Sequence, residues 1–111
     1  WLYRFDVVPD SNPEPSGGAT HASERPYVFE TLHTVGRPLG DRDRRASADM
    51  AAYWTAFARA GDPNGAGRPA WPDFREQADF LLEFTNQGPV ARPMPNAPRL
   101  DLIEAFYARS R

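Results

Sequence analysis

The chain has 111 residues, enough for one small domain that buries more than about 60% of its unfolded surface. Its net charge is −2 and its 13 basic residues are arginines dispersed along the whole chain, which argues against nucleic-acid binding. It has no cysteine, which excludes disulfides and thiolate chemistry, and no apolar run approaches the ~20 residues that span a bilayer, so no membrane partner is expected.

The first predicted element is a strand over residues 1–8. Its side chains are mostly aromatic or β-branched and are apolar throughout apart from Arg4 and Asp6, as in a strand covered on both faces. Pro9 closes the strand. The chain begins at Trp1, inside this strand pattern and without an initiator methionine, which indicates a segment of a longer polypeptide.

Residues 9–24 are rich in proline, glycine and small polar side chains and are predicted to form a loop. His21 falls near the end of this loop. One or two helical turns are expected between Glu24 and Glu30, where Pro26 is tolerated in the first turn.

The strongest pattern predicts a helix over residues 43–60, beginning at Asp41 or Asp43, since acidic residues stabilise the positive end of a helix. Gly61 supplies the stop. Apolar side chains recur at three- and four-residue spacing and form one wide face that we interpret as core rather than as a ligand pocket: Ala46, Met50, Tyr53, Trp54, Phe57 and Ala58.

The remaining third of the chain alternates irregular and regular segments. Residues 62–78 are expected to be irregular and anchored by burial of Trp71 and Phe74. A second strand is predicted over residues 80–84, where apolar side chains are nearly continuous.

A proline-rich linker is expected over residues 89–98, followed by a C-terminal helix over 99–109. This helix either packs on its own domain or docks a second subunit. Two strands far apart in sequence with helices between them indicate the end of an α/β sheet more than a self-contained fold. No internal repeat is visible.

Four segments in the right order resemble the type-B carboxylesterases, the α/β-hydrolase family that also holds the cholinesterases and bacterial p-nitrobenzyl esterases. Residues 3–6 (YRFD) resemble the strand before the family's histidine loop. Residues 21–29 (HASERPYVF) resemble its His-x-x-Glu-Leu-Pro-Phe-Val-Phe. Residues 53–64 (YWTAFARAGDPN) resemble Tyr-Trp-x-x-Phe-Ala-x-x-Gly-x-Pro-Asn, and residues 71–74 resemble the Trp-Pro-x-Tyr/Phe that follows.

The resemblance implies the C-terminal portion of an α/β-hydrolase fold and ester hydrolysis by a Ser-His-Glu/Asp triad without a cofactor or metal. His21 would be the general base, because the histidine comes last in the chain order of this superfamily. The serine and the acid would lie in the missing N-terminal part of the same hydrolase, which becomes the partner of this chain, with a small-molecule ester as substrate.

Two local features depart from a complete site. Ser16 lacks the glycine two residues before it, so it does not match the Gly-x-Ser-x-Gly nucleophile elbow. Arg25 stands where the family has an apolar residue, which puts the packing or substrate contact there in doubt, though not His21.

Three further residues are candidates for the surroundings of His21. Glu24 is either a hydrogen-bonding group behind the site or an N-terminal cap of the following turn. Tyr27 and Phe29 are candidates for the wall of an acyl or alcohol pocket. His33 has no such context, and a metal site shared by His21 and His33 lacks the spacing and the supporting ligands of zinc sites.

Two functions remain open from sequence. The first is a serine carboxylesterase, inactive as this segment alone, and the second is an esterase-like scaffold that has lost catalysis and binds proteins. We expect a bacterial protein, soluble in the cytoplasm or secreted. Without the rest of the hydrolase, the strand over 1–8 and the helix face of Met50, Trp54 and Phe57 would be bare, so the isolated chain is predicted to be poorly folded or self-associated.

Overall fold

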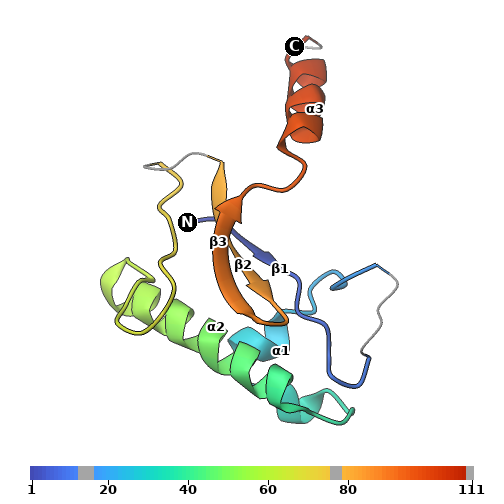
Figure 1. Cartoon of the computed structure of the whole chain (residues 1–111), viewed down its shortest axis with the longest axis vertical. Helices are drawn as coiled ribbons and strands as arrows, with labels where there is room; N and C mark the ends of the chain where they lie inside the picture. The colour runs from blue at the N-terminus through green and yellow to red at the C-terminus, as the bar shows by residue number, and fades with distance from the viewer. Residues whose placement is uncertain (13–16, 76–78, 110–111) are drawn as a thin grey trace.

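The computed structural model describes residues 1–12, 17–75 and 79–109. A small sheet lies against one long helix, and a second helix projects from the sheet near the carboxyl end of the chain (Figure 1). The predicted combination of helices and strands in one α/β unit is therefore present in the described residues.

The sheet joins the beginning of the chain to its last third. β1 (Tyr3–Phe5) lies parallel to β2 (Phe80–Thr85), with Tyr3 opposite Leu82, and β3 (Gly88–Pro93) lies antiparallel to β2 on the other side. The predicted strand over 80–84 is thus confirmed and is one residue longer. β2 is the central strand of the three, and its residues 81–84 are all buried.

The strand predicted over residues 1–8 is wrong in length. The backbone N–H of Asp6 still donates to the carbonyl of Phe84, but the N–H of Val8 donates instead to the side chain of Asn86, in the turn that ends β2 (2.8 Å). Because β2 turns back at Asn86, no backbone is left to pair with Val7 and Val8. Both are nonetheless buried, at 1% and 4% exposure, so their apolar side chains indicate burial rather than pairing in the sheet.

The linker predicted over residues 89–98 is also wrong in its first half, which forms β3. Among the described strands β3 pairs only with β2, and Pro89 and Pro93 are four residues apart. Backbone N–H groups alternate in direction along a strand, so two prolines at this spacing can both turn their missing N–H groups away from β2. An edge strand tolerates proline for this reason.

The long helix α2 (Asp41–Ala60) confirms the predicted helix and its termination at Gly61, which has a φ of 72°. Its buried face includes Met50 and Tyr53, both at 0% exposure beneath the sheet. The expectation that Met50 would be bare is therefore wrong. Phe57 is 48% exposed, so the predicted apolar face is core only over its first part.

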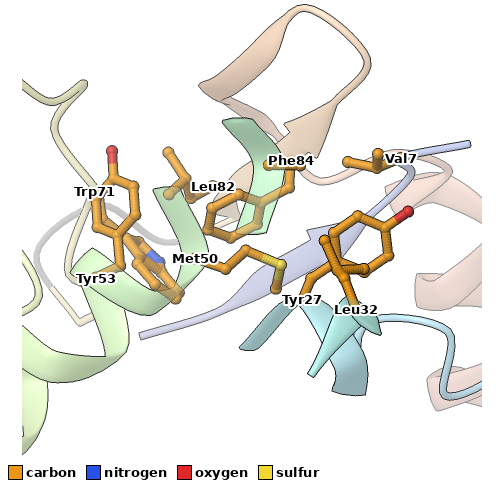
Figure 2. Close-up of a cluster of buried hydrophobic side chains, with 9 residues drawn as sticks. Val7, Tyr27, Leu32, Met50, Tyr53, Trp71, Leu82 and Phe84 are labelled. Carbon is orange, nitrogen blue, oxygen red and sulfur yellow. The ribbon is translucent and has the colours of Figure 1, made fainter. Parts of the chain in front are cut away.

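The core gathers side chains from the sheet, α2 and the loops between them, and its aromatic rings meet mostly edge to face. Figure 2 shows Tyr53 and Trp71 at one end of this cluster and Val7 and Tyr27 at the other. Burying one large side chain of this kind contributes about 1.5–3 kcal/mol. The cluster comprises Val7, Tyr27, Leu32, Ala46, Met50, Tyr53, Trp71, Leu82 and Phe84.

Two short helical segments follow the first loop, α1 (Arg25–Val28), as predicted, and the 3-10 helix η1 (Leu32–Thr34). The described part of the segment 62–78 has no helix or strand, as expected, and Trp71 anchors it by burial. Phe74 does not, since it is 38% exposed.

The C-terminal helix α3 (Ala97–Arg109) confirms the predicted helix and begins two residues earlier. None of its residues is buried, and Figure 1 shows it pointing away from the sheet. The described residues therefore show no burial of this helix against its own domain. None of the helices in the described ranges combines the length and the apolar character that a bilayer crossing needs.

Candidate active site

His21 lies in a tight turn on the surface, within the loop that leaves the carboxyl end of β1. The turn is closed at Ser23, whose backbone N–H and hydroxyl both donate to the carbonyl of Thr20, at 3.2 Å and 2.7 Å. His21 is exposed, and within residues 1–12, 17–75 and 79–109 its imidazole makes no hydrogen bond. An imidazole held in this way can receive a partner from outside the described chain.

Ala22, directly after the histidine, has a φ of 61° in the left-handed region. An alanine there costs about 1–2 kcal/mol, because its Cβ approaches the following carbonyl. Such strain persists only where surrounding contacts enforce it, and it occurs often at functional sites. The conformation of the turn that carries His21 is therefore imposed by its connections to the rest of the fold.

The edge of the sheet from which this loop departs favours a site. β1 and β2 run parallel, so their carboxyl ends meet at one edge, and open α/β sheets bind ligands outside the carboxyl ends of their strands. The hydrogen bond from Val8 to Asn86 ties the start of the histidine loop to the end of β2 at this edge.

The incoming arm of the loop is fastened to the first turn of α2. Asp10 accepts a hydrogen bond from the backbone N–H of Arg42 (3.0 Å) and pairs with the Arg42 guanidinium, which also donates to the carbonyl of Val8 (3.2 Å). A side chain at Gly40 would overlap the Asp10 carboxylate, so this close approach requires glycine.

The outgoing arm is fastened to the same turn through Tyr27 and Asp43. The Tyr27 hydroxyl donates to Asp43 Oδ1 (2.7 Å), Arg37 donates to both carboxylate oxygens (3.0 Å each), and the Gly40 N–H donates to Oδ2 (3.1 Å). Ser47 adds a hydrogen bond from its hydroxyl to the carbonyl of Tyr27 (2.8 Å). Tyr27 and Asp43 are 2% and 0% exposed.

The electrostatics of this cluster follow from burial and hydrogen bonding. Burial alone would raise the pKa of Asp43, but hydrogen bonds from Arg37, Tyr27 and the Gly40 N–H outweigh it and lower that pKa to about 2. Burial, and then the hydrogen bond to Asp43, raise the pKa of Tyr27. The carboxylate is thus charged and the phenol neutral over the working range of an enzyme.

Sequence reasoning missed Asp43 as an interaction centre and treated it only as an acid at a helix end. One signal was available: Asp43 is the third residue of α2 and accepts from the N–H of Gly40, the N-cap residue. An acidic residue at this position commonly closes back on the N-cap. Its pairing with Tyr27 and Arg37 depends on tertiary structure and left no signal.

The other candidate residues have distinct environments. Glu24 is half-buried at the N-cap of α1, and its side chain makes no capping hydrogen bond; its charge adds to burial in raising the pKa of Tyr3. Phe29 is 72% exposed. Tyr27 borders a cavity of about 260 Å³ under the histidine turn, which Ala22 and Ser23 also line.

Neither His33 nor Ser16 was predicted to take part in catalysis. His33 is exposed in η1, and in the described parts of the chain no three His, Asp or Glu side chains gather as a metal site requires. Ser16 lies outside the described residues.

A family model described as the carboxylesterase family matches residues 1–102. The chain belongs to the carboxylesterase family. Carboxylesterase 4A of Bos taurus is 31% identical over 90 residues, which cover 78% of this chain and 16% of that protein. Bile salt-activated lipase of Bos taurus is 44% identical over 75 residues, covering 63% and 12%, and fumonisin B1 esterase of Sphingopyxis macrogoltabida is 30% identical over 89 residues, covering 73% and 16%.

Solved esterase structures share the fold of this carboxylesterase segment. A structure titled PNB esterase superposes with a TM-score of 0.74 at 26% identity, covering 91% of this chain and 20% of that one. A carboxylesterase of Geobacillus stearothermophilus superposes with a TM-score of 0.70 at 31% identity, covering 91% and 21%. The predicted fold class, a portion of an α/β-hydrolase fold, is confirmed. The chain spans only about a fifth of these structures.

Proposed function

We propose that the protein to which this chain belongs hydrolyses carboxylic esters and that this chain is its C-terminal segment and supplies the general base, His21. The observation that carries the proposal is the family match over residues 1–102, combined with an exposed imidazole on an anchored turn at the carboxyl edge of parallel strands. Relatives named as a lipase, a carboxylesterase and a fumonisin esterase support an ester substrate.

In this mechanism His21 accepts the proton of a serine hydroxyl as the serine attacks the ester carbonyl. The imidazolium then returns a proton to the leaving alcohol, and the cycle repeats with water to release the acid. Imidazole suits both steps because its unperturbed pKa lies near neutrality. The serine and an orienting carboxylate come from the N-terminal part of the hydrolase, and no cofactor or metal takes part.

The neighbouring candidates take supporting roles. Glu24 lies three residues from His21 and is half-buried, and its side chain makes no capping hydrogen bond to its own helix turn, so its carboxylate is available to fix a group behind the site. Phe29 offers an exposed aromatic surface to the substrate or to the rest of the enzyme. Tyr27 lines the cavity below the turn, and its hydroxyl is bound to Asp43.

The decisive experiment measures p-nitrophenyl ester hydrolysis by the full-length protein and by its His21→Ala variant. Losing the general base of a triad costs several powers of ten, and we expect kcat to fall by about 10⁴ or more. His33→Ala is the matched control, because it removes the other exposed histidine from the same region, and it should retain wild-type kcat.

Comparable rates for wild type and His21→Ala would refute the proposed role of His21. No hydrolysis by the wild-type protein, together with an upstream sequence lacking Gly-x-Ser-x-Gly, would instead support the non-catalytic binding scaffold. The isolated chain should hydrolyse nothing under either result, because the nucleophile is expected upstream.

A further inference from the structure

The first turn of α2, residues 40–43, fastens both arms of the loop that carries His21. We propose that Asp43 is a positioning residue for catalysis, acting through Tyr27 to hold the turn of His21 in its reactive place. This proposal rests on the proposed function and goes beyond it by assigning a role to a buried carboxylate that lies outside the triad.

Hydrogen bonds along successive backbone segments connect Asp43 to the turn that contains the histidine. Asp43 holds the hydroxyl of Tyr27, and Ser47 of the same helix holds its carbonyl. The N–H of Tyr27 donates to the carbonyl of Glu24 (2.9 Å), and the N–H of Arg25 donates to the carbonyl of Ala22. The turn from Thr20 to Ser23 that contains His21 comes directly before. Because Tyr27 is held at two points, the backbone turn that carries His21 is held in place as well.

The incoming arm is fixed independently of Tyr27. Asp10 and the carbonyl of Val8 are both bound by Arg42, one residue before Asp43. The loop between these arms is thus closed against one helical turn. This closure gives a physical reason why Ala22 stays in a left-handed conformation that it would otherwise leave.

The carboxylate of Asp43 suits this position because it meets only donors. Tyr27 O–H, two N–H groups of Arg37 and the N–H of Gly40 all point at its two oxygens. A carboxylate accepts all four hydrogen bonds, whereas the amide of asparagine would turn an NH₂ group toward other donors. Because the group is fully buried, water cannot replace the lost bonds.

The test compares full-length Asp43→Asn and Tyr27→Phe with wild type in ester hydrolysis. A displacement of about 1 Å in a catalytic group can lower the rate about 100-fold, so we expect kcat to fall about 10- to 100-fold while KM stays within about 2-fold. The double variant should lose no more than the worse single variant, because both substitutions break one connection.

Two controls separate positioning from loss of stability. Asp41→Asn removes another acid from the same helical turn, but Asp41 is exposed and among the described residues pairs only with Arg44, so kcat should stay at the wild-type value. Leu82→Val weakens the buried cluster away from the loop and should lower the melting temperature without lowering kcat well below that temperature.

Wild-type kcat in Tyr27→Phe and Asp43→Asn would overturn the proposal, and so would equal losses in Leu82→Val. If Asp43→Asn does not fold, Tyr27→Phe decides, since it keeps the Asp43–Arg37 ion pair. The result for His21→Ala keeps the two proposals apart. An inactive His21→Ala with a fully active Tyr27→Phe refutes positioning alone, whereas an active His21→Ala refutes the proposed function.

Discussion

Arg42 binds Asp10 across 32 positions of sequence, with a 3.0 Å hydrogen bond from its backbone N–H to Asp10 Oδ2 and a guanidinium contact to Oδ1. The N–H belongs to the first turn of α2, which has no intrahelical acceptor for it. Asp10 therefore provides the acceptor that this backbone N–H lacks within the helix. The same interaction closes the loop of His21. A carboxylate at this end is also favoured by the helix dipole.

Gly40→Ala tests how tightly Asp10 approaches the helix. The new Cβ would overlap the Asp10 carboxylate, while the φ of −99° at Gly40 suits alanine, so the cost is steric alone. We expect a loss of about 1–3 kcal/mol in the free energy of unfolding, as for overpacked sites. Urea unfolding of the full-length protein measures it.

The same substitution in an Asp10→Ala background should cost less, because the overlapping group is gone. Gly65→Ala is the control, since its Cβ meets only the end of the flexible Arg68 side chain. An equal cost for Gly40→Ala with and without Asp10 would show that the close approach is not what excludes a side chain.

Asp43 should make the free energy of unfolding depend on pH between about pH 4 and pH 2. Its folded-state pKa of about 2 lies below the usual value near 3.9 of an unfolded chain, so its contribution is complete above about pH 4 and disappears as pH falls through 2. The difference corresponds to about 2–3 kcal/mol. Asp43→Asn should be less stable than wild type at pH 7, and the gap should shrink between pH 4 and pH 2.

Unfolding in urea at several pH values measures that gap, with the exposed Asp41→Asn as reference. A gap between Asp43→Asn and wild type that stays constant down to pH 2 would mean that the charge of Asp43 does not stabilise the fold.

The sequence predicts those parts of this fold whose pattern lies within one segment of the chain. The helix from Asp41 to Ala60 and the stop at Gly61 were predictable because apolar spacing and glycine conformation act within one segment. β3 was not predictable, because its prolines argue against a strand. Only the sheet topology shows that β3 lies at an edge, where proline is tolerated.

The candidate site divides in the same way. His21 was found from the resemblance of its flanking residues, and the turn that holds it is local. Tyr27 of α1 meets Asp43 of α2 and Arg37 through tertiary packing, so no sequence pattern indicates that these three side chains lie together. The burial of Tyr27 and the exposure of Phe29, two residues later, likewise follow from which side of α1 faces α2.

Asn64, in the segment that resembles the family signature, has a structural explanation. Its side chain accepts from the N–H of Trp71 (2.7 Å) and donates to the carbonyl of Trp71 (3.1 Å) and to Asp62. The indole of Trp71 in turn donates to the carbonyl of Leu2 beside β1 (2.8 Å). Asn64 thereby fixes the loop that covers one end of the core.

Asn64→Asp keeps the shape but replaces the NH₂ donor by an oxygen facing the Trp71 carbonyl and the Asp62 carboxylate. We expect it to destabilise the full-length protein by about 1–3 kcal/mol, because the hydrogen bonds from the NH₂ group to the Trp71 carbonyl and to Asp62 are lost and like charges meet. Asn64→Asp in an Asp62→Ala background should recover part of the loss. Thermal unfolding followed by tryptophan fluorescence measures both, and a wild-type melting temperature for Asn64→Asp would contradict this role of the amide.

The isolated chain should self-associate. α3 exposes 72% of Leu102 and 66% of Phe106, and apolar rings around Trp1 and Trp54 line an open cavity of about 270 Å³ next to β1. Soluble monomers rarely leave apolar surfaces of this extent uncovered. Sedimentation velocity at increasing concentration should show species larger than a monomer, and Leu102→Glu with Phe106→Glu should reduce them if α3 makes the contact. A monomer at all concentrations with one sharp melting transition would instead contradict this prediction and show that the isolated chain folds stably with these apolar surfaces exposed.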